Sequence, residues 1–227
     1  MQLRRLVFLN LITILFIGCK SHEKAIGEAP IILDNFNFET NIKDIYPDRY
    51  KVDGDSVYAF PSSYVKESTT AIDTLYEEYW SSDKTPKGLN YKQLIYTKED
   101  TIAIFENFPF ANLNIVTTLD HKKIMMISSF LEEISKTKTD DFVSKLNQKY
   151  GKAERVSQNY NEYEVYTWNL KDRTIKYSVL LNERKDPRHF DKTTGVEILN
   201  AYFFIIKKEY ENVFVDKMDE GALNYCK

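Results

Sequence analysis

The feature that most restricts the fold is a segment near the C-terminal end, residues 196–206, that becomes apolar on both faces. It ends in Ala201-Tyr202-Phe203-Phe204-Ile205-Ile206, with no polar residue in alternate positions. A strand carries such side chains comfortably only where both of its faces are covered. The segment therefore predicts a central strand with a packed layer on each side of its sheet.

Turn residues elsewhere predict four antiparallel hairpins. Each turn separates two segments rich in β-branched and aromatic residues, and the turns are Asp53-Gly54, Lys98–Asp100, Asp120-His121 and Lys171–Arg173. Asp-Gly is the strongest of these signals, because both positions of a tight hairpin turn need a positive φ. The pattern is typical of an antiparallel sheet built from hairpins.

One helix is predicted over residues 139–150. Thr139 can cap its first turn, and the acidic pair that follows suits the positive end of the helix dipole. Phe142, Leu146 and Tyr150 recur every four residues and so share one face. Gly151 then predicts a left-handed end to the helix.

Two further helical segments complete the expected architecture. Apolar spacing predicts a second helix over residues 68–80, and a short turn of helix is expected at residues 41–46, stopped by Pro47. The expected fold class is α+β, with an antiparallel sheet built from hairpins and two or three covering helices. A helix followed by three strands, residues 139–207, is the best-defined unit, and residues 36–60 could be a degenerate first copy of it.

Composition excludes several classes of protein. Of the 227 residues, 43% are apolar and 14% aromatic, which is too many for a disordered chain. Two cysteines cannot support a disulfide scaffold, and 7 Gly and 6 Pro exclude a collagen-like sequence.

The N-terminal residues have the pattern of a targeting segment. Arg4 and Arg5 precede an apolar run over residues 6–17, which is too short to span a bilayer as a helix. The run ends in Phe16-Ile17-Gly18-Cys19 and is followed at once by polar residues.

This pattern resembles that of a bacterial lipoprotein precursor, and the residue usage is similar to that of lipoproteins from the Bacteroidota. The resemblance implies that the Cys19 thiol receives a diacylglyceryl group, that cleavage falls between Gly18 and Cys19, and that the new amine is acylated, for example with palmitate. It further implies a location in the bacterial cell envelope, with the lipid bilayer as a partner, most plausibly at the outer membrane; which side of that membrane remains open. An ordinary secretory signal is the alternative.

The resemblance divides the chain into three parts. We expect a signal peptide over residues 1–18, a flexible tether over 19–30 and an α+β domain over 31–227, which could form two subdomains with a boundary near residues 130–138. Without residues 1–18 the chain has 29 basic and 34 acidic residues, a net charge of −5. That balance argues against nucleic acid as a partner, because nucleic-acid binding needs a concentrated basic surface.

No catalytic or metal-binding motif stands out. The glycines are isolated, so no phosphate-binding loop is present, and there is no Gly-x-Ser-x-Gly element. His189, between Asp186 and Asp191, is best explained by a polar loop. We therefore predict no metal and no cofactor, and an enzymatic role is uncertain but less expected than a binding role.

Aromatic clusters offer the main candidate for a binding surface. Alternation places Tyr166 and Trp168 on one face of a strand, and Trp80 lies in a second cluster. Such residues either belong to the core or form a platform for a sugar or a protein. Cys226 has no intramolecular partner if Cys19 is lipidated, so a free thiol is expected there.

These observations favour a membrane-anchored envelope lipoprotein with a non-enzymatic binding domain, whose partner is most plausibly another protein. A carbohydrate-binding or glycan-processing surface lipoprotein, a hydrolase with a dispersed motif and an immunity-type protein are the alternatives.

Overall fold

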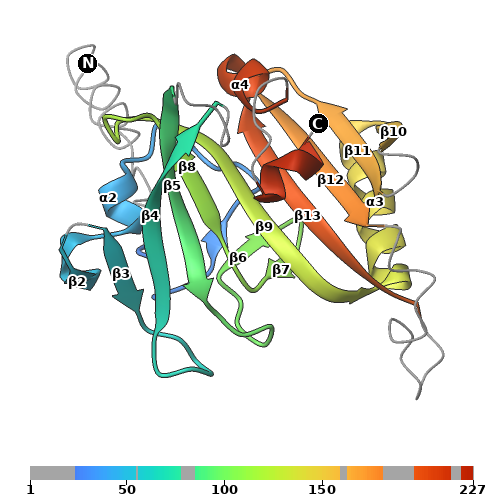
Figure 1. Cartoon of the computed structure of the whole chain (residues 1–227). Helices are drawn as coiled ribbons and strands as arrows, with labels where there is room; N and C mark the ends of the chain where they lie inside the picture. Colours follow the sequence, from blue (N-terminus) through green and yellow to red (C-terminus); the bar gives the residue numbers. More distant parts are fainter. Residues whose placement is uncertain are drawn as a thin grey trace, which may run out of the picture.

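A ten-stranded antiparallel sheet dominates the computed structural model, which describes residues 24–54, 56–77, 85–158, 163–180, 197–215 and 221–226 (Figure 1). Its strands follow the order β10-β11-β12-β13-β9-β8-β5-β4-β3-β2. In chain order they are β2 (Lys51–Asp53), β3 (Val57–Phe60), β4 (Ser68–Tyr76), β5 (Pro86–Ile95), β8 (Asn114–Thr117), β9 (Ile124–Ser135), β10 (Glu154–Gln158), β11 (Tyr163–Asn169), β12 (Arg173–Leu180) and β13 (Ile198–Lys207). With the short helices that accompany the sheet, the α+β class is broadly confirmed.

The strand that is apolar on both faces lies inside the sheet, as predicted. β13 pairs with β12 on one edge and with β9 on the other. Phe203 and Ile205 belong to the larger core, whereas Phe204 and Ile206 belong to a smaller core on the opposite face. All four side chains are fully buried, so each face of β13 is covered by a separate layer.

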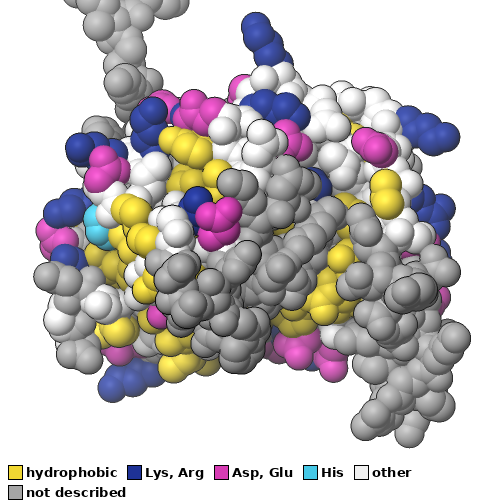
Figure 2. Space-filling view, turned by 45° about the horizontal axis from the view of Figure 1, so that its top comes forward, with side chains coloured by type: hydrophobic (Ala, Val, Ile, Leu, Met, Phe, Trp, Pro, Cys, Tyr) yellow, Lys and Arg dark blue, Asp and Glu magenta, His cyan; other side chains and the backbone are white. Residues whose placement is uncertain are grey.

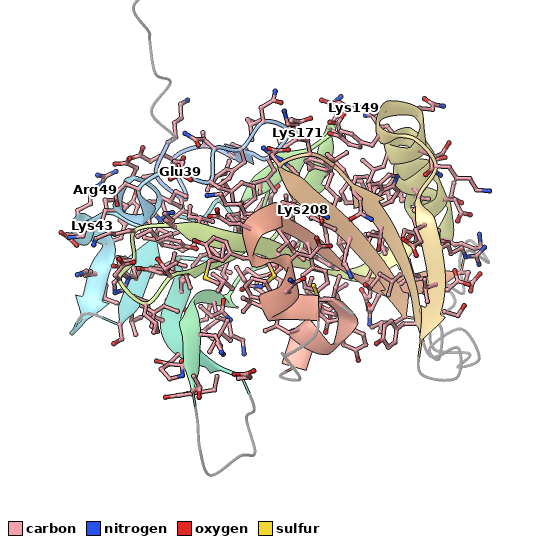
Figure 3. All side chains as sticks on the ribbon, turned by 90° about the horizontal axis from the view of Figure 1, so that it is seen from above. Glu39, Lys43, Arg49, Lys149, Lys171 and Lys208 are labelled. Atoms are coloured by element: carbon pink, nitrogen blue, oxygen red, sulfur yellow. The ribbon has the colours of Figure 1, made fainter. Side chains whose placement is uncertain are left out.

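The two faces of the sheet are covered by different parts of the chain. The larger core packs beneath α2 (Ile42–Ile45), α3 (Lys136–Tyr150) and a small second sheet. The smaller core lies beneath the C-terminal helices η4 (Lys208–Tyr210), α4 (Glu211–Val215) and η5 (Gly221–Cys226). Figure 3 shows α3 and the N-terminal segments on one side of the sheet and the C-terminal helices on the other.

The predicted hairpin around Lys98–Asp100 is wrong, because the strand that follows this turn belongs to a second sheet. β1 (Ile31–Ile32), β6 (Ala103–Phe105) and β7 (Phe108–Phe110) form a three-stranded sheet in the order β1-β6-β7. The β1–β6 pair is parallel, unlike the expected all-antiparallel arrangement. β5 instead pairs with β4 and β8, and β6 pairs with β1 and β7.

The helix predicted over residues 68–80 is also wrong where the structure describes it, because residues 68–76 form strand β4. Ser68 and Thr70 are buried on one face, and the strand pairs with β3 and β5. Four of the nine residues are Thr or Ile, whose β-branched side chains favour a pleated strand. This preference outweighs the helical spacing of the apolar residues.

The long helix is confirmed, but it begins earlier than predicted. Ser135, rather than Thr139, is the N-cap, and its side chain accepts a hydrogen bond from the Lys138 backbone N–H. Thr139 instead lies buried inside the helix, with its hydroxyl 3.3 Å from that of Tyr177. Gly151 ends the helix at a positive φ of 89°, although its ψ of 171° lies outside the left-handed helical region.

The other expected turns are largely as predicted. The short helix α2 begins after the N-cap Asn41, and the hairpins β2–β3, β8–β9 and β11–β12 are all present. The unit that follows α3 has four strands rather than three, because the polar edge strand β10 gave no apolar pattern. A helix followed by a four-strand meander therefore occurs at both edges of the sheet, as the short α2 with β2–β5 and as the longer α3 with β10–β13.

The packed part of the chain begins before residue 31. Ala25 and Ile26, assigned above to the tether, are buried, and the Ile26 N–H donates to the Ile45 carbonyl at 2.9 Å. The large sheet runs without interruption through residues on both sides of the boundary considered near 130–138. Among the described residues, no helix is both long and apolar enough to cross a membrane.

Candidate functional site

The described residues form an open cleft, which we call the β9 cleft. It has a volume of about 920 Å³ and lies between the β6–β7 hairpin, the C-terminal half of β9, the first turns of α3 and the loop that follows β5. Phe108, Leu131 and Phe142 give it an apolar floor, and charged side chains surround them. Its size is in the range of binding sites for ligands or peptide segments.

The first wall is the β6–β7 hairpin, which turns through Glu106 and Asn107. Phe105 and Phe108 pair directly, so the turn has two residues, and both have positive φ angles, 51° and 61°. Asparagine adopts this conformation readily, whereas glutamate is strained in it. The Glu106 N–H donates to the carboxyl group of Asp34, 3.2 Å and 3.3 Å from its two oxygens, which helps to hold the strained residue.

Side chains from the last turns of α3 fix the same hairpin turn. The Glu106 carboxylate is 9% exposed, contacts the Lys149 ammonium group and accepts a hydrogen bond from the Tyr150 hydroxyl at 2.9 Å. The Lys145 ammonium group donates to the Glu106 backbone carbonyl at 2.6 Å. Figure 3 shows Lys149 at this end of α3. The helix and the hairpin are therefore joined at one residue.

The pKa values of the two carboxyl groups in this cluster, Asp34 and Glu106, are shifted in opposite directions. Burial, and then a hydrogen bond between the Asp34 and Glu106 side chains, raise the pKa of Asp34, whereas the hydrogen bond from the Glu106 backbone N–H acts to lower it. Burial acts to raise the pKa of Glu106 as well, but hydrogen bonds with Lys149, Asp34 and Tyr150 outweigh it and hold that pKa below its ordinary value. The cluster therefore favours the protonated form of Asp34 and the ionised form of Glu106, whose carboxylate faces Lys149.

The second wall is the end of β9, where a bulge changes the direction of the strand. Glu132 and Glu133 together oppose Asn200 of β13, and Glu133 has a φ of 53°. The Asn200 side-chain oxygen accepts the Glu133 N–H at 2.9 Å and stabilises this conformation. The Glu133 carboxylate in turn lies 2.8 Å from the Lys98 ammonium group, which joins β9 to the loop after β5.

Beyond β8, no strand in the described part of the chain pairs with that edge of β9. β8 pairs with β9 only as far as Ser128. At Phe130 the Asn112 side chain replaces a strand: its oxygen accepts the Phe130 N–H at 2.9 Å, and its nitrogen donates to the Phe130 carbonyl at 2.6 Å. Residues 131–135 then border the β9 cleft. The arrangement is suited to holding a chain segment beside β9.

The aromatic residues predicted as a binding surface lie elsewhere. Trp168 is buried at 2% exposure, and its indole N–H is 3.2 Å from the Asn147 side-chain oxygen and 3.1 Å from the Gly151 carbonyl. Tyr166 is half-buried beside it and donates to the Glu164 carboxylate at 3.1 Å. Both belong to the packing around α3, and neither lines the β9 cleft. Trp80 lies outside the described residues, as do Gly18 and Cys19.

The remaining candidates show no sign of reactive chemistry. Cys226 is a buried free thiol, and burial raises its pKa to about 12, which keeps it protonated. His121 lies in the β8–β9 turn, with its Nδ1 atom 2.8 Å from the Tyr91 hydroxyl. His189 is outside the described residues. Within the described ranges, no group of three or more His, Cys, Asp or Glu side chains is placed to hold a metal ion.

The cleft could be anticipated only in part. Asn107 between two short aromatic strands is a turn signal, because asparagine tolerates a positive φ. Nothing local, however, indicates that Asp34 reaches Glu106, since the two are far apart in sequence. Comparison of the chain with protein families, with curated proteins and with solved structures finds no match.

Proposed function

We propose that this chain is a lipid-anchored binding protein of the bacterial cell envelope, and that the β9 cleft is the place where it binds a partner protein. The Phe16-Ile17-Gly18-Cys19 sequence supports the anchor through acylated Cys19 and the envelope location. The β9 cleft is the observation that carries the binding role.

Three properties of the cleft favour binding over catalysis. Its described lining contains no histidine or cysteine. Its acidic residues Glu106 and Glu133 are engaged in ion pairs with Lys149 and Lys98, which position the walls. An apolar floor surrounded by polar groups is the usual arrangement at protein interfaces.

A protein partner is favoured over a glycan. A sugar platform would need exposed aromatic faces, and of the three residues behind that alternative Trp168 is buried and Tyr166 half-buried, while Trp80 lies outside the described residues. The charged surface in Figure 2 intersperses Lys and Arg with Asp and Glu, with no large basic patch on that face. This distribution is in keeping with a partner other than nucleic acid.

Site-specific photo-cross-linking in intact cells tests the proposal. A photoreactive amino acid at Thr137, an exposed residue of the cleft, should capture one protein, identified by mass spectrometry of the cross-linked peptide. The same amino acid at Ser157, exposed on β10 outside the cleft, is the control and should not capture that protein. Equal capture from both positions, or none from Thr137, would rule out the cleft as the binding site.

A further inference from the structure

The unpaired edge of β9 runs along the β9 cleft and could pair with a bound segment. From Phe130 to Ser135 the strand borders the cleft, a length of about 17 Å at roughly 3.3 Å per residue. Asn112 already supplies the two hydrogen bonds that a neighbouring strand would make at Phe130. A segment of about six extended residues could continue from this point along β9.

The charges around the cleft select the kind of segment. Acidic residues outnumber basic ones six to three in its lining. Two of the basic residues are engaged, Lys98 with Glu133 and Lys145 with the Glu106 carbonyl. Glu132 on β9 and Asp141 on α3 are exposed and form no ion pair within the described part of the chain. These two carboxylates complement a positively charged ligand.

We propose that the β9 cleft binds an extended, positively charged peptide segment of a partner protein, which adds to the free edge of β9 and directs Lys or Arg side chains toward Glu132 and Asp141. This inference rests on the proposed function and adds the chemistry of the partner. Backbone hydrogen bonds would supply affinity, as in other cases of strand addition, and the two acids would supply selectivity.

Selection from a phage-displayed library of randomised decapeptides tests the inference on the full chain in detergent. Peptides enriched on the wild-type protein should be rich in Lys and Arg. The best of them, made synthetically, should bind about tenfold more weakly to the Glu132→Gln, Asp141→Asn double variant, the size expected for two exposed ion pairs. The control Glu154→Gln removes an exposed acid on β10, outside the cleft, and should change Kd less than twofold.

Backbone methylation tests the strand geometry separately. Methylating alternate nitrogens of the selected peptide in one register should abolish binding, because those N–H groups would face β9, whereas the other register should be tolerated. Equal tolerance of both registers would refute strand addition. Enrichment of acidic or neutral peptides, no enrichment, or equal binding to the double variant would refute the selectivity for positive charge. If either part of this inference is refuted but cross-linking at Thr137 still captures a protein, the proposed binding function stands without it.

Discussion

At the scale of single residues, Glu106 connects three segments of the chain: its own hairpin turn, the segment around Asp34 and the end of α3. Its backbone is strained at a positive φ, its N–H binds Asp34, and its carboxylate binds Lys149 and Tyr150. Strain of this kind persists only where surrounding contacts fix the residue. The position of one cleft wall therefore depends on the charge of one carboxylate.

The Glu106→Gln variant should lose stability in a pH-dependent way. Because the folded pKa of Glu106 lies below its ordinary value of 4.5, its ionic contribution is present above that pH and is lost as pH falls through the folded pKa. Asp34 acts oppositely, since its raised pKa means that its contribution is lost as pH rises. Urea unfolding at pH 7 should show a loss of roughly 1 to 3 kcal/mol, the usual size for a hydrogen bond to a charged group.

The same comparison at pH 3.5 should show a smaller loss, because that pH lies below the ordinary pKa of 4.5 and the ionic contribution declines as pH falls from there toward the folded pKa. Glu154→Gln, on the exposed edge strand β10, is the matched control and should be nearly neutral at both values of pH. A loss for Glu106→Gln that does not change with pH would show that the charge of Glu106 is unimportant.

At the scale of elements, α3 has two roles. Phe142 and Leu146 bury one face against the sheet, and its other residues line the β9 cleft or hold the β6–β7 turn. Its beginning at Ser135 follows directly from the end of β9. The helix start therefore sets where the β9 and α3 sides of the cleft meet.

Replacing Ser135 with alanine should cost about 1 kcal/mol of unfolding free energy, because the Lys138 N–H would lose its capping partner. Ser144→Ala is the control, since Ser144 is an exposed serine within the same helix and alanine is the better helix former. Urea unfolding of the two variants should therefore separate them. A Ser135→Ala protein as stable as wild type would show that the helix does not begin where the structure has it.

At the scale of the whole molecule, the sequence predicts those elements whose structure is determined by neighbouring residues. The two-sided β13, the Asp53-Gly54 turn and the face of α3 formed by Phe142 and Leu146 were all predictable, because each depends on neighbouring residues. The strand β4 was not predictable, because its threonines favour a strand whereas the spacing of its apolar residues favours a helix. The parallel pairing of Ile31 with Ala103 and the contact of Asp34 with Glu106 join distant segments, and no local pattern predicts such partners.

The proposed membrane anchor concerns the whole chain and has its own test. Cys19→Ser should leave an unprocessed precursor that incorporates no labelled fatty acid, because the acylated sulfur would be missing. Cys226→Ser is the control and should be processed normally, since that thiol is buried in the folded domain. Processing and labelling would be followed by gel mobility and by metabolic labelling. A Cys19→Ser chain that is still cut and still labelled would refute the anchor.

If Cys19 carries the proposed lipid, the burial of Ala25 and Ile26 limits how far the domain can stand from it. Only residues 20–24 separate the two, and a fully extended chain covers at most about 3.6 Å per residue, so the spacer reaches roughly 20 Å. That distance is shorter than the thickness of a bilayer's hydrocarbon interior, about 30 Å. A domain attached through so short a linker would meet only those partners that themselves come close to the lipid surface.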